Sequence, residues 1–212
     1  SDKKLILDTL GNMQAQGVTI NGAGNPVIAL TQIGGDRSHV LVVNGTTGVL
    51  DKEFELDVSN RATYDPQIRS ITYDSDSDRI IAVGTARHST ATGAFSAFAK
   101  SFDLSLNNVT NRMWRANHNG SYEMRFLDCD LDDTLSTQNR LFVVGTANTS
   151  KSTTRRGVLV GSLPLNDDDV TYSGTDIDFD EYRYTEQGEV TEVTSNSIWE
   201  TDKTTGEAID NS

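Results

Sequence analysis

RIIAVGT, at residues 79–85, is an apolar run that ends in Gly-Thr, and two related runs flank it in the chain. PVIALT lies at 26–31 and RLFVVGT at 140–146, each followed by a polar loop and a second apolar run. With Ile28, Ile81 and Phe142 taken as equivalents, the spacings are 81 − 28 = 53 and 142 − 81 = 61 residues. Self-similarity at such a period indicates a repeat architecture.

Each repeat divides into four β-like runs, and no helical periodicity is convincing anywhere in the chain. The second run of each repeat, quoted above, is almost continuously apolar, which is typical of a strand buried on both faces. Later runs alternate polar and apolar residues, which is typical of a strand with one exposed face. The predicted strands are 16–20, 27–32, 39–43 and 53–58, then 68–73, 80–85, 95–102 and 110–115, then 122–129, 141–146, 158–163 and 175–184.

Four antiparallel strands per repeat, with the innermost pair most apolar, describe a β-propeller blade. The motifs AVGT (82–85), FSAFAKSFD (95–103) and VNGTTGVLD (43–51) also resemble the bacterial β-propeller repeats of secreted and surface proteins. This resemblance covers about residues 16–184 and implies a fold more than an activity. We therefore expect an all-β fold, a β-propeller-like array of about three four-stranded antiparallel blades within residues 1–188, at approximately 10–60, 61–117 and 118–188.

The number of predicted blades is smaller than a closed ring requires, since propellers have about 4 to 8 blades. The chain could be a fragment of a longer propeller, its termini could combine into a fourth blade, or two chains could complete one ring. Residues 189–212 read as the start of a further blade or as a polar C-terminal tail. We favour a fragment or half of a larger ring, because 203–212 is polar like a linker.

The chain is strongly acidic, since its 212 residues include 31 Asp and Glu but only 18 Lys and Arg, a formal net charge of −13. This charge argues against nucleic-acid binding and against anionic membranes, which both require excess Lys and Arg. No apolar stretch approaches the roughly 20 residues of a membrane span, so membrane insertion is not expected. The single cysteine, Cys129, permits no disulfide within the chain. Together with the resemblance, these features predict an extracellular or cell-surface protein.

Basic residues gather in the loops between the second and third strands of each repeat, here called the b–c loops. These loops and their ends carry Arg37, Arg87, Lys151, Arg155 and Arg156, with His39 and His88 near them. A propeller usually binds ligands over its central channel on this side, and guanidinium groups can hold a carboxylate or sulfate bidentately. We therefore predict a ligand site at Arg37, Arg87, His88, Arg155 and Arg156. The alternative is that these arginines only offset neighbouring acids.

Alternating carboxylates at Asp74, Asp76 and Asp78 lie in the predicted turn between the first two strands of the second repeat. Such carboxylates can supply the oxygen ligands that Ca²⁺ prefers. Calcium loops of the D-x-D-x-D-G type carry Gly where this chain has Arg79. Asp is also common in hairpin turns, because it accepts backbone hydrogen bonds. The turn is thus a candidate calcium site, with an ordinary turn as the alternative.

No nucleophile elbow, phosphate-binding loop or paired-histidine zinc motif occurs in the sequence. The leading prediction is a non-catalytic binding or adhesion module of a secreted or cell-surface bacterial protein. It would recognise a glycan or another macromolecule, such as a protein surface, through the b–c loops. One alternative is a propeller-type polysaccharide hydrolase or lyase, and another is a structural module completed by self-association.

Overall fold

The computed structural model of the chain describes residues 13–33, 37–56, 66–87, 95–105, 112–117, 124–132, 140–148, 156–164, 172–173, 178–183 and 190–192. The described residues form β-strands and no helix, which confirms the all-β prediction. In chain order the strands are β1 (Met13–Ile20), β2 (Pro26–Gln32), β3 (Ser38–Val43), β4 (Leu50–Leu56), β5 (Pro66–Asp74), β6 (Arg79–Arg87), β7 (Phe95–Asp103), β8 (Arg112–Asn117), β9 (Met124–Asp132), β10 (Arg140–Asn148), β11 (Arg156–Pro164), β12 (Tyr172–Ser173), β13 (Asp178–Arg183) and β14 (Val190–Glu192).

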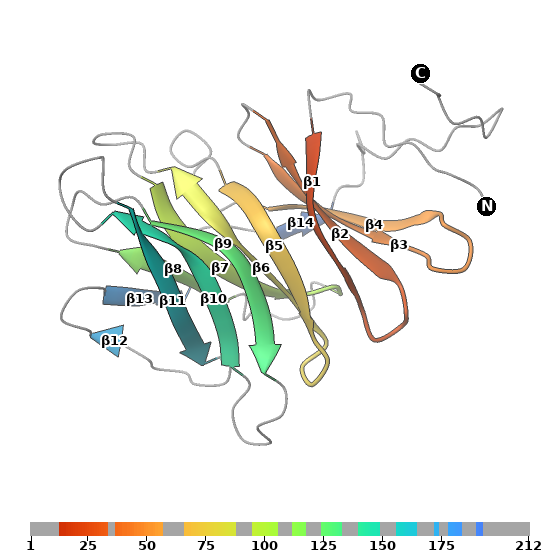
Figure 1. The fold of residues 1–212 in the computed structure, drawn as a ribbon. Helices are drawn as coiled ribbons and strands as arrows, with labels where there is room; N and C mark the ends of the chain where they lie inside the picture. Colours follow the sequence, from red (N-terminus) through yellow and green to blue (C-terminus); the bar gives the residue numbers. More distant parts are fainter. Residues whose placement is uncertain are drawn as a thin grey trace.

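The strands form three antiparallel sheets that follow one another through the molecule (Figure 1). Sheet 1 has the order β1-β2-β3-β4-β14, sheet 2 the order β12-β13-β8-β7-β6-β5, and sheet 3 the order β11-β10-β9. Within each repeat, the first strand pairs with the second and the second with the third. In the described residues none of these sheets closes on itself.

The outermost predicted strands join sheets that the sequence did not indicate. The predicted fourth strand of the third repeat, 175–184, contains β13, and β13 pairs with β8 in sheet 2 and not with β11. The strand expected to open a further blade contains β14, which pairs with β4 in sheet 1. An outer strand can join any free sheet edge, because every edge offers unpaired backbone N–H and C=O groups. The alternation of polar and apolar residues within 175–184 indicates a strand, but it does not indicate which sheet edge that strand pairs with.

A β-bulge in the first strand of each repeat fixes how the repeats align. The irregularity lies opposite Ala29 and Leu30 in β2, Val83 and Gly84 in β6, and Val144 and Gly145 in β10. The structural equivalents are therefore Ala29, Val83 and Val144, with spacings of 83 − 29 = 54 and 144 − 83 = 61 residues. The first spacing corrects the value of 53, because the alignment by Ile28 was displaced by one residue.

The glycine of the repeated Gly-Thr pair belongs to this bulge in sheets 2 and 3. A Cβ atom on Gly84 would collide with the carbonyl oxygen of Gln67, and one on Gly145 would collide with that of Arg125. Both obstacles are backbone atoms that cannot move without breaking the strand pairing. Gly is required here because a neighbouring backbone approaches closely.

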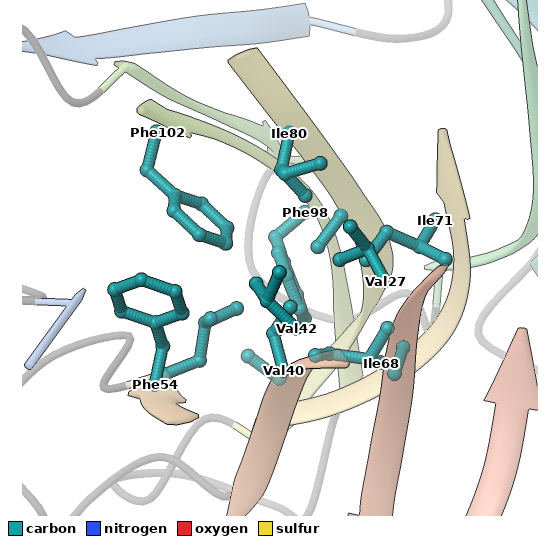
Figure 2. Packing of buried hydrophobic residues seen from close by; sticks show 13 residues of the cluster. Val27, Val40, Val42, Phe54, Ile68, Ile71, Ile80, Phe98 and Phe102 are labelled. Atoms are coloured by element: carbon teal, nitrogen blue, oxygen red, sulfur yellow. The ribbon is translucent and has the colours of Figure 1, made fainter. Parts of the chain in front are cut away.

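A hydrophobic core joins sheets 1 and 2, and Figure 2 shows side chains from the two sheets pointing toward one another. Phe54 of β4 and Phe102 of β7 pack edge to face, with ring centroids 5.9 Å apart. The buried members are Val27, Ala29, Val40, Val42, Phe54 and Leu56 from sheet 1 and Ile68, Ile71, Ile80, Ala82, Ala86, Phe98 and Phe102 from sheet 2.

A second core lies between the opposite face of sheet 2 and sheet 3. Its buried members are Ile81, Val83, Ala97 and Ala99 from sheet 2 and Phe126, Leu141 and Val143 from sheet 3. Sheet 2 is thus covered on both faces, and consecutive residues of β6 alternate between the two cores. This confirms the burial on both faces predicted for 80–85 from its continuous apolar character. For 141–146 the same prediction is wrong on one face, where Phe142 and Val144 are 41% and 44% exposed, because none of the described residues forms a sheet over that face.

Candidate functional site

The predicted arginine site is distributed over the ends of three sheets. The carbonyl of Arg37 accepts a hydrogen bond from the backbone N–H of Gln32 at 2.9 Å, just beyond the last β2–β3 pair. Arg87 is the last residue of β6 and pairs with Phe95. Arg156 is the first residue of β11 and pairs with Asn148. His88 and Arg155 lie outside the described residues.

Polar contacts between sheets 1 and 2 show that these ends lie on one side of the stack. Thr31 Oγ1, at the end of β2, donates to the carbonyl of Ile68 at 3.0 Å, and Ser38 Oγ accepts from the N–H of Ile68 at 3.2 Å. Ile68 lies in β5 opposite Gly84, near the end of β6. The b–c end of sheet 1 therefore lies beside the b–c end of sheet 2.

The opposite ends of sheets 1 and 2 also adjoin. Lys52 Nζ, near the start of β4, donates to the carbonyl of Leu104 at 2.8 Å, just beyond β7. Sheets 2 and 3 are joined by a hydrogen bond in which Ser70 Oγ donates to Asp128 Oδ1 at 2.7 Å. Ser70 and Asp128 occupy equivalent positions, because Ser70 pairs with Val83 in sheet 2 and Asp128 pairs with Val144 in sheet 3. β5 and β9 therefore run side by side in the same sense (Figure 1). Arg37, Arg87 and Arg156 accordingly lie at the same end of the three sheets.

The acidic turn at 74–78 is a hydrogen-bonded hairpin turn. Asp74 is buried at 4% exposure and accepts hydrogen bonds from the backbone N–H of Asp76 at 3.1 Å and from the hydroxyl of Ser77. Asp78 has a φ of 51° and accepts a hydrogen bond from the hydroxyl of Tyr73 at 2.8 Å. Burial, followed by this hydrogen bond, raises the pKa of Tyr73.

The predicted calcium ligands are therefore partly occupied as acceptors within the turn. Among the described residues, no three side chains of His, Cys, Asp or Glu are grouped so that they could hold a metal ion. This geometry matches the alternative reading of an ordinary Asp-rich turn. The calcium prediction gains no support from it.

A buried histidine–glutamate pair in sheet 1 was not anticipated from the sequence. His39, predicted at the start of the strand 39–43 beside a b–c loop, is the second residue of β3, and its Nδ1 lies 3.0 Å from Glu53 Oε1 of β4. Both side chains are almost wholly buried, at 2% and 1% exposure. The other ring nitrogen of His39, Nε2, is buried without a hydrogen-bond partner. Only the β3–β4 register brings these residues together, so no local motif could have indicated the pair.

Cys129 packs against the core between sheets 2 and 3. Burial raises the pKa of its thiol to about 12, while the hydrogen bond from Ser70 acts in the opposite direction and the nearby Asp128 and Asp130 raise it further. The thiolate is the reactive form of cysteine. At neutral pH the raised pKa keeps the Cys129 thiol protonated, which lowers its reactivity as a nucleophile.

No family model matches the chain, and no curated protein or solved structure matches it either. Within the residues that the structure describes, no helix is long and apolar enough to cross a membrane.

Proposed function

We propose that the chain is a non-catalytic binding module built of consecutive β-propeller blades, belonging to a secreted or cell-surface bacterial protein. The propeller arrangement is supported by the regular stacking of sheets 1, 2 and 3. Sheet 1 packs against sheet 2, and sheet 2 against sheet 3, through residues at equivalent positions of their strands, such as Ala29 in sheet 1 and Val83 in sheet 2. The ligand is an acidic glycan or another acidic macromolecule, bound at the b–c ends of the blades.

One observation carries the proposal: Arg37, Arg87 and Arg156 lie at the same end of three neighbouring sheets. The chain has 31 acidic and only 18 basic residues, and on this proposal three arginines at one end give an acidic molecule a local basic site. Planar guanidinium groups suit carboxylates and sulfates, which they bind through paired hydrogen bonds. Neighbouring strand ends would offer several such groups to one extended ligand.

Binding to a sulfated glycosaminoglycan and to polygalacturonate, measured by calorimetry, tests the proposal. Arg156→Gln is compared with Arg140→Gln, because the two residues lie at opposite ends of sheet 3 and both changes remove one positive charge. We expect Arg156→Gln to weaken binding about tenfold, since a charge-assisted hydrogen bond contributes roughly 1.5–3 kcal/mol. Arg140→Gln should leave binding nearly unchanged.

Equal losses in the two variants would mean that only net charge matters, which contradicts a site at the b–c ends. Absence of binding to either polymer by the parent chain would also contradict the proposal. A reducing-sugar assay on the same polymers addresses the hydrolase alternative. Release of new sugar ends by the parent chain would replace a binding module with an enzyme.

A further inference from the structure

The face of sheet 3 that points away from sheet 2 carries an apolar strip beside a line of carboxylates. Asp130 of β9 pairs with Phe142 of β10, and Asp128 pairs with Val144, so both carboxylates lie on the same face as the strip. We call this surface the outer face of sheet 3. An exposed apolar patch with a polar rim marks an interaction site. The strip consists of Phe142 and Val144 of β10 and Val158 and Val160 of β11, which are 41%, 44%, 85% and 69% exposed.

The two carboxylates replace small uncharged residues that hold the equivalent positions in the other sheets. In sheet 3 the residues at these positions are Asp128 and Asp130, and both are exposed. A partner that covered them would bury two carboxylates, and burying a carboxylate costs free energy unless it is paired with a cation. The partner that suits this face therefore brings positive charge. Where a further sheet packs over the same face, the first strand instead carries Gly17 and Thr19 in sheet 1 and Ser70 and Thr72 in sheet 2.

Hydrogen bonds within the chain hold both carboxylates in position. Asp128 Oδ1 accepts a hydrogen bond from Ser70 Oγ at 2.7 Å, and Asp130 Oδ1 accepts one from the N–H of Leu131 at 2.9 Å. The two acids are two residues apart in β9, a distance of about 6.6 to 6.8 Å along a strand. Residues at positions i and i+4 of an α-helix are about 6 Å apart along the helix axis. Two basic residues one helical turn apart can therefore meet both acids.

The width of the apolar strip also suits a single helix. The strip spans two neighbouring strands, which lie about 4.8 Å apart, and a helix with its side chains is about 10–12 Å across. An amphipathic helix buries its apolar stripe by packing against such a surface. The acids lie on β9, on one side of the strip, while β11 on the other side contains no acidic residue. The basic residues of the helix are therefore expected along one flank only.

We propose that the outer face of sheet 3 binds a basic amphipathic helix of another protein. The apolar side chains of the helix cover the strip on β10 and β11, and Lys or Arg side chains along one flank pair with Asp128 and Asp130. The net charge of −13 on the chain attracts such a segment as the two molecules approach. The inference goes beyond the proposed ligand site, because it uses none of the arginines there and takes a partner of the opposite charge.

Fluorescence anisotropy of three labelled peptides, titrated with the full chain, tests the proposal. Each peptide has about 14 residues, which is roughly four helical turns. The first has Leu and Lys at helical spacing, so that they form two faces of a helix. The second has the same residues in strict alternation, and the third has the helical spacing with Glu in place of each Lys. We expect the first peptide to bind with a micromolar dissociation constant and the other two at least about tenfold more weakly.

Variants of the chain locate the bound peptide. Val160→Lys is compared with Val18→Lys, because Val18 is similarly exposed at 64% but lies on sheet 1, and both changes add one positive charge. We expect Val160→Lys to bind the first peptide about tenfold more weakly than Val18→Lys does. Asp130→Asn is compared with Asp51→Asn, at an exposed acid of β4, and should weaken binding about threefold, since an exposed ion pair contributes little. Thermal unfolding followed by circular dichroism checks that all four variants fold.

Failure of the first peptide to bind the parent chain would overturn the proposal. Equally tight binding of the alternating peptide would overturn it as well, because attraction by net charge would then suffice. Equal dissociation constants for folded Val160→Lys and Val18→Lys would show that the peptide binds at another surface. If Asp130→Asn binds as tightly as Asp51→Asn, the pairing of the basic flank with the carboxylates of β9 is wrong.

Discussion

Sheets 2 and 3 share their strand pairing around the bulge, yet they differ in how many faces they bury. In sheet 2, Ile80 and Ala82 of β6 face sheet 1, while Ile81 and Val83 face sheet 3, and all four are 0% exposed. In sheet 3, Leu141 and Val143 of β10 are 0% exposed against sheet 2, while Phe142 and Val144 are 41% and 44% exposed.

The difference shows that residue type and register do not determine burial in a stack of sheets. Val83 and Val144 are both valines, each lies at the corresponding bulge of its sheet, and each pairs with residues at equivalent positions. One is buried because a further sheet follows it, and the other is exposed because none of the described residues forms a sheet over it. The energetic importance of a position therefore depends on the neighbouring sheet. This dependence can be measured.

The largest expected effect comes from placing a charge at these two equivalent positions. Val83→Asp should lower the free energy of unfolding by about 4 kcal/mol or more, because the carboxylate would be buried without a partner. Val144→Asp should cost less than about 1 kcal/mol in the free chain, because its side chain can reach solvent. Urea denaturation followed by circular dichroism measures both. Similar losses in the two variants would show that the exposed face of sheet 3 is in fact covered.

The second-largest expected loss of stability is at the buried His39–Glu53 pair of sheet 1. His39 occupies the position that Phe98 occupies in sheet 2. Glu53→Ala should destabilise the chain by roughly 3 kcal/mol, because it leaves the buried His39 without its partner. The double variant His39→Phe with Glu53→Leu should be markedly less destabilised, since apolar replacement of a buried pair is often neutral. Asp51→Ala, at an exposed position of the same strand, is the control. If Glu53→Ala behaves like Asp51→Ala, the pair has no structural role.

A smaller effect is expected at the bulge glycines of sheets 2 and 3. Gly84→Ala and Gly145→Ala should each cost about 2 kcal/mol, because the added methyl collides with a backbone carbonyl of the neighbouring strand. In Gly17→Ala the methyl would instead meet a side-chain methyl of Ile71 at 3.3 Å, which can shift. That variant should lose less than about 1 kcal/mol. A greater loss in Gly17→Ala than in Gly84→Ala would contradict the assigned register.

The smallest expected effect on stability at neutral pH is that of Cys129, which lies between sheets 2 and 3. Its pKa is raised from 9.0 to about 12, so the folded chain retains the proton at pH values where the unfolded chain releases it. The resulting stability is fully present below pH 9 and is lost as the pH rises from 9 toward 12. Alkylation by iodoacetamide at pH 8 should be at least about tenfold slower in the native chain than in urea. Equal rates would show that the thiol is accessible and unperturbed.

Much of the local structure could be predicted from the sequence. The runs around 80–85 and 141–146 indicate strands through their β-branched residues and flanking turn residues, and β6 and β10 contain them. The hairpin formed by β5 and β6 follows from the Asp-rich turn between the two apolar runs. Such features depend on backbone preferences and on alternation over a few residues, which are local properties.

The candidate site was predictable only in part. Arg87 and Arg156 follow directly from the strand limits, because each lies at the end of an apolar run. The sequence predicts His39 at the start of a strand beside a loop, but its burial against Glu53 depends on the pairing of β3 with β4. Likewise, the carboxylates of Asp74 and Asp78 are engaged by Ser77 and Tyr73, which composition alone could not indicate.

Local sequence patterns suffice to predict that this protein is built of β-strands in repeats, with the second strand of each repeat the most apolar. They suffice because alternation, β-branching and turn residues act over distances of a few residues. Three features depend on the folded arrangement: the sheet edges that β13 and β14 join, the burial of Val83 but not of Val144, and the choice of sheet faces that pack together. These outcomes depend on contacts between residues far apart in the chain, and a strand's own pattern does not specify its neighbour.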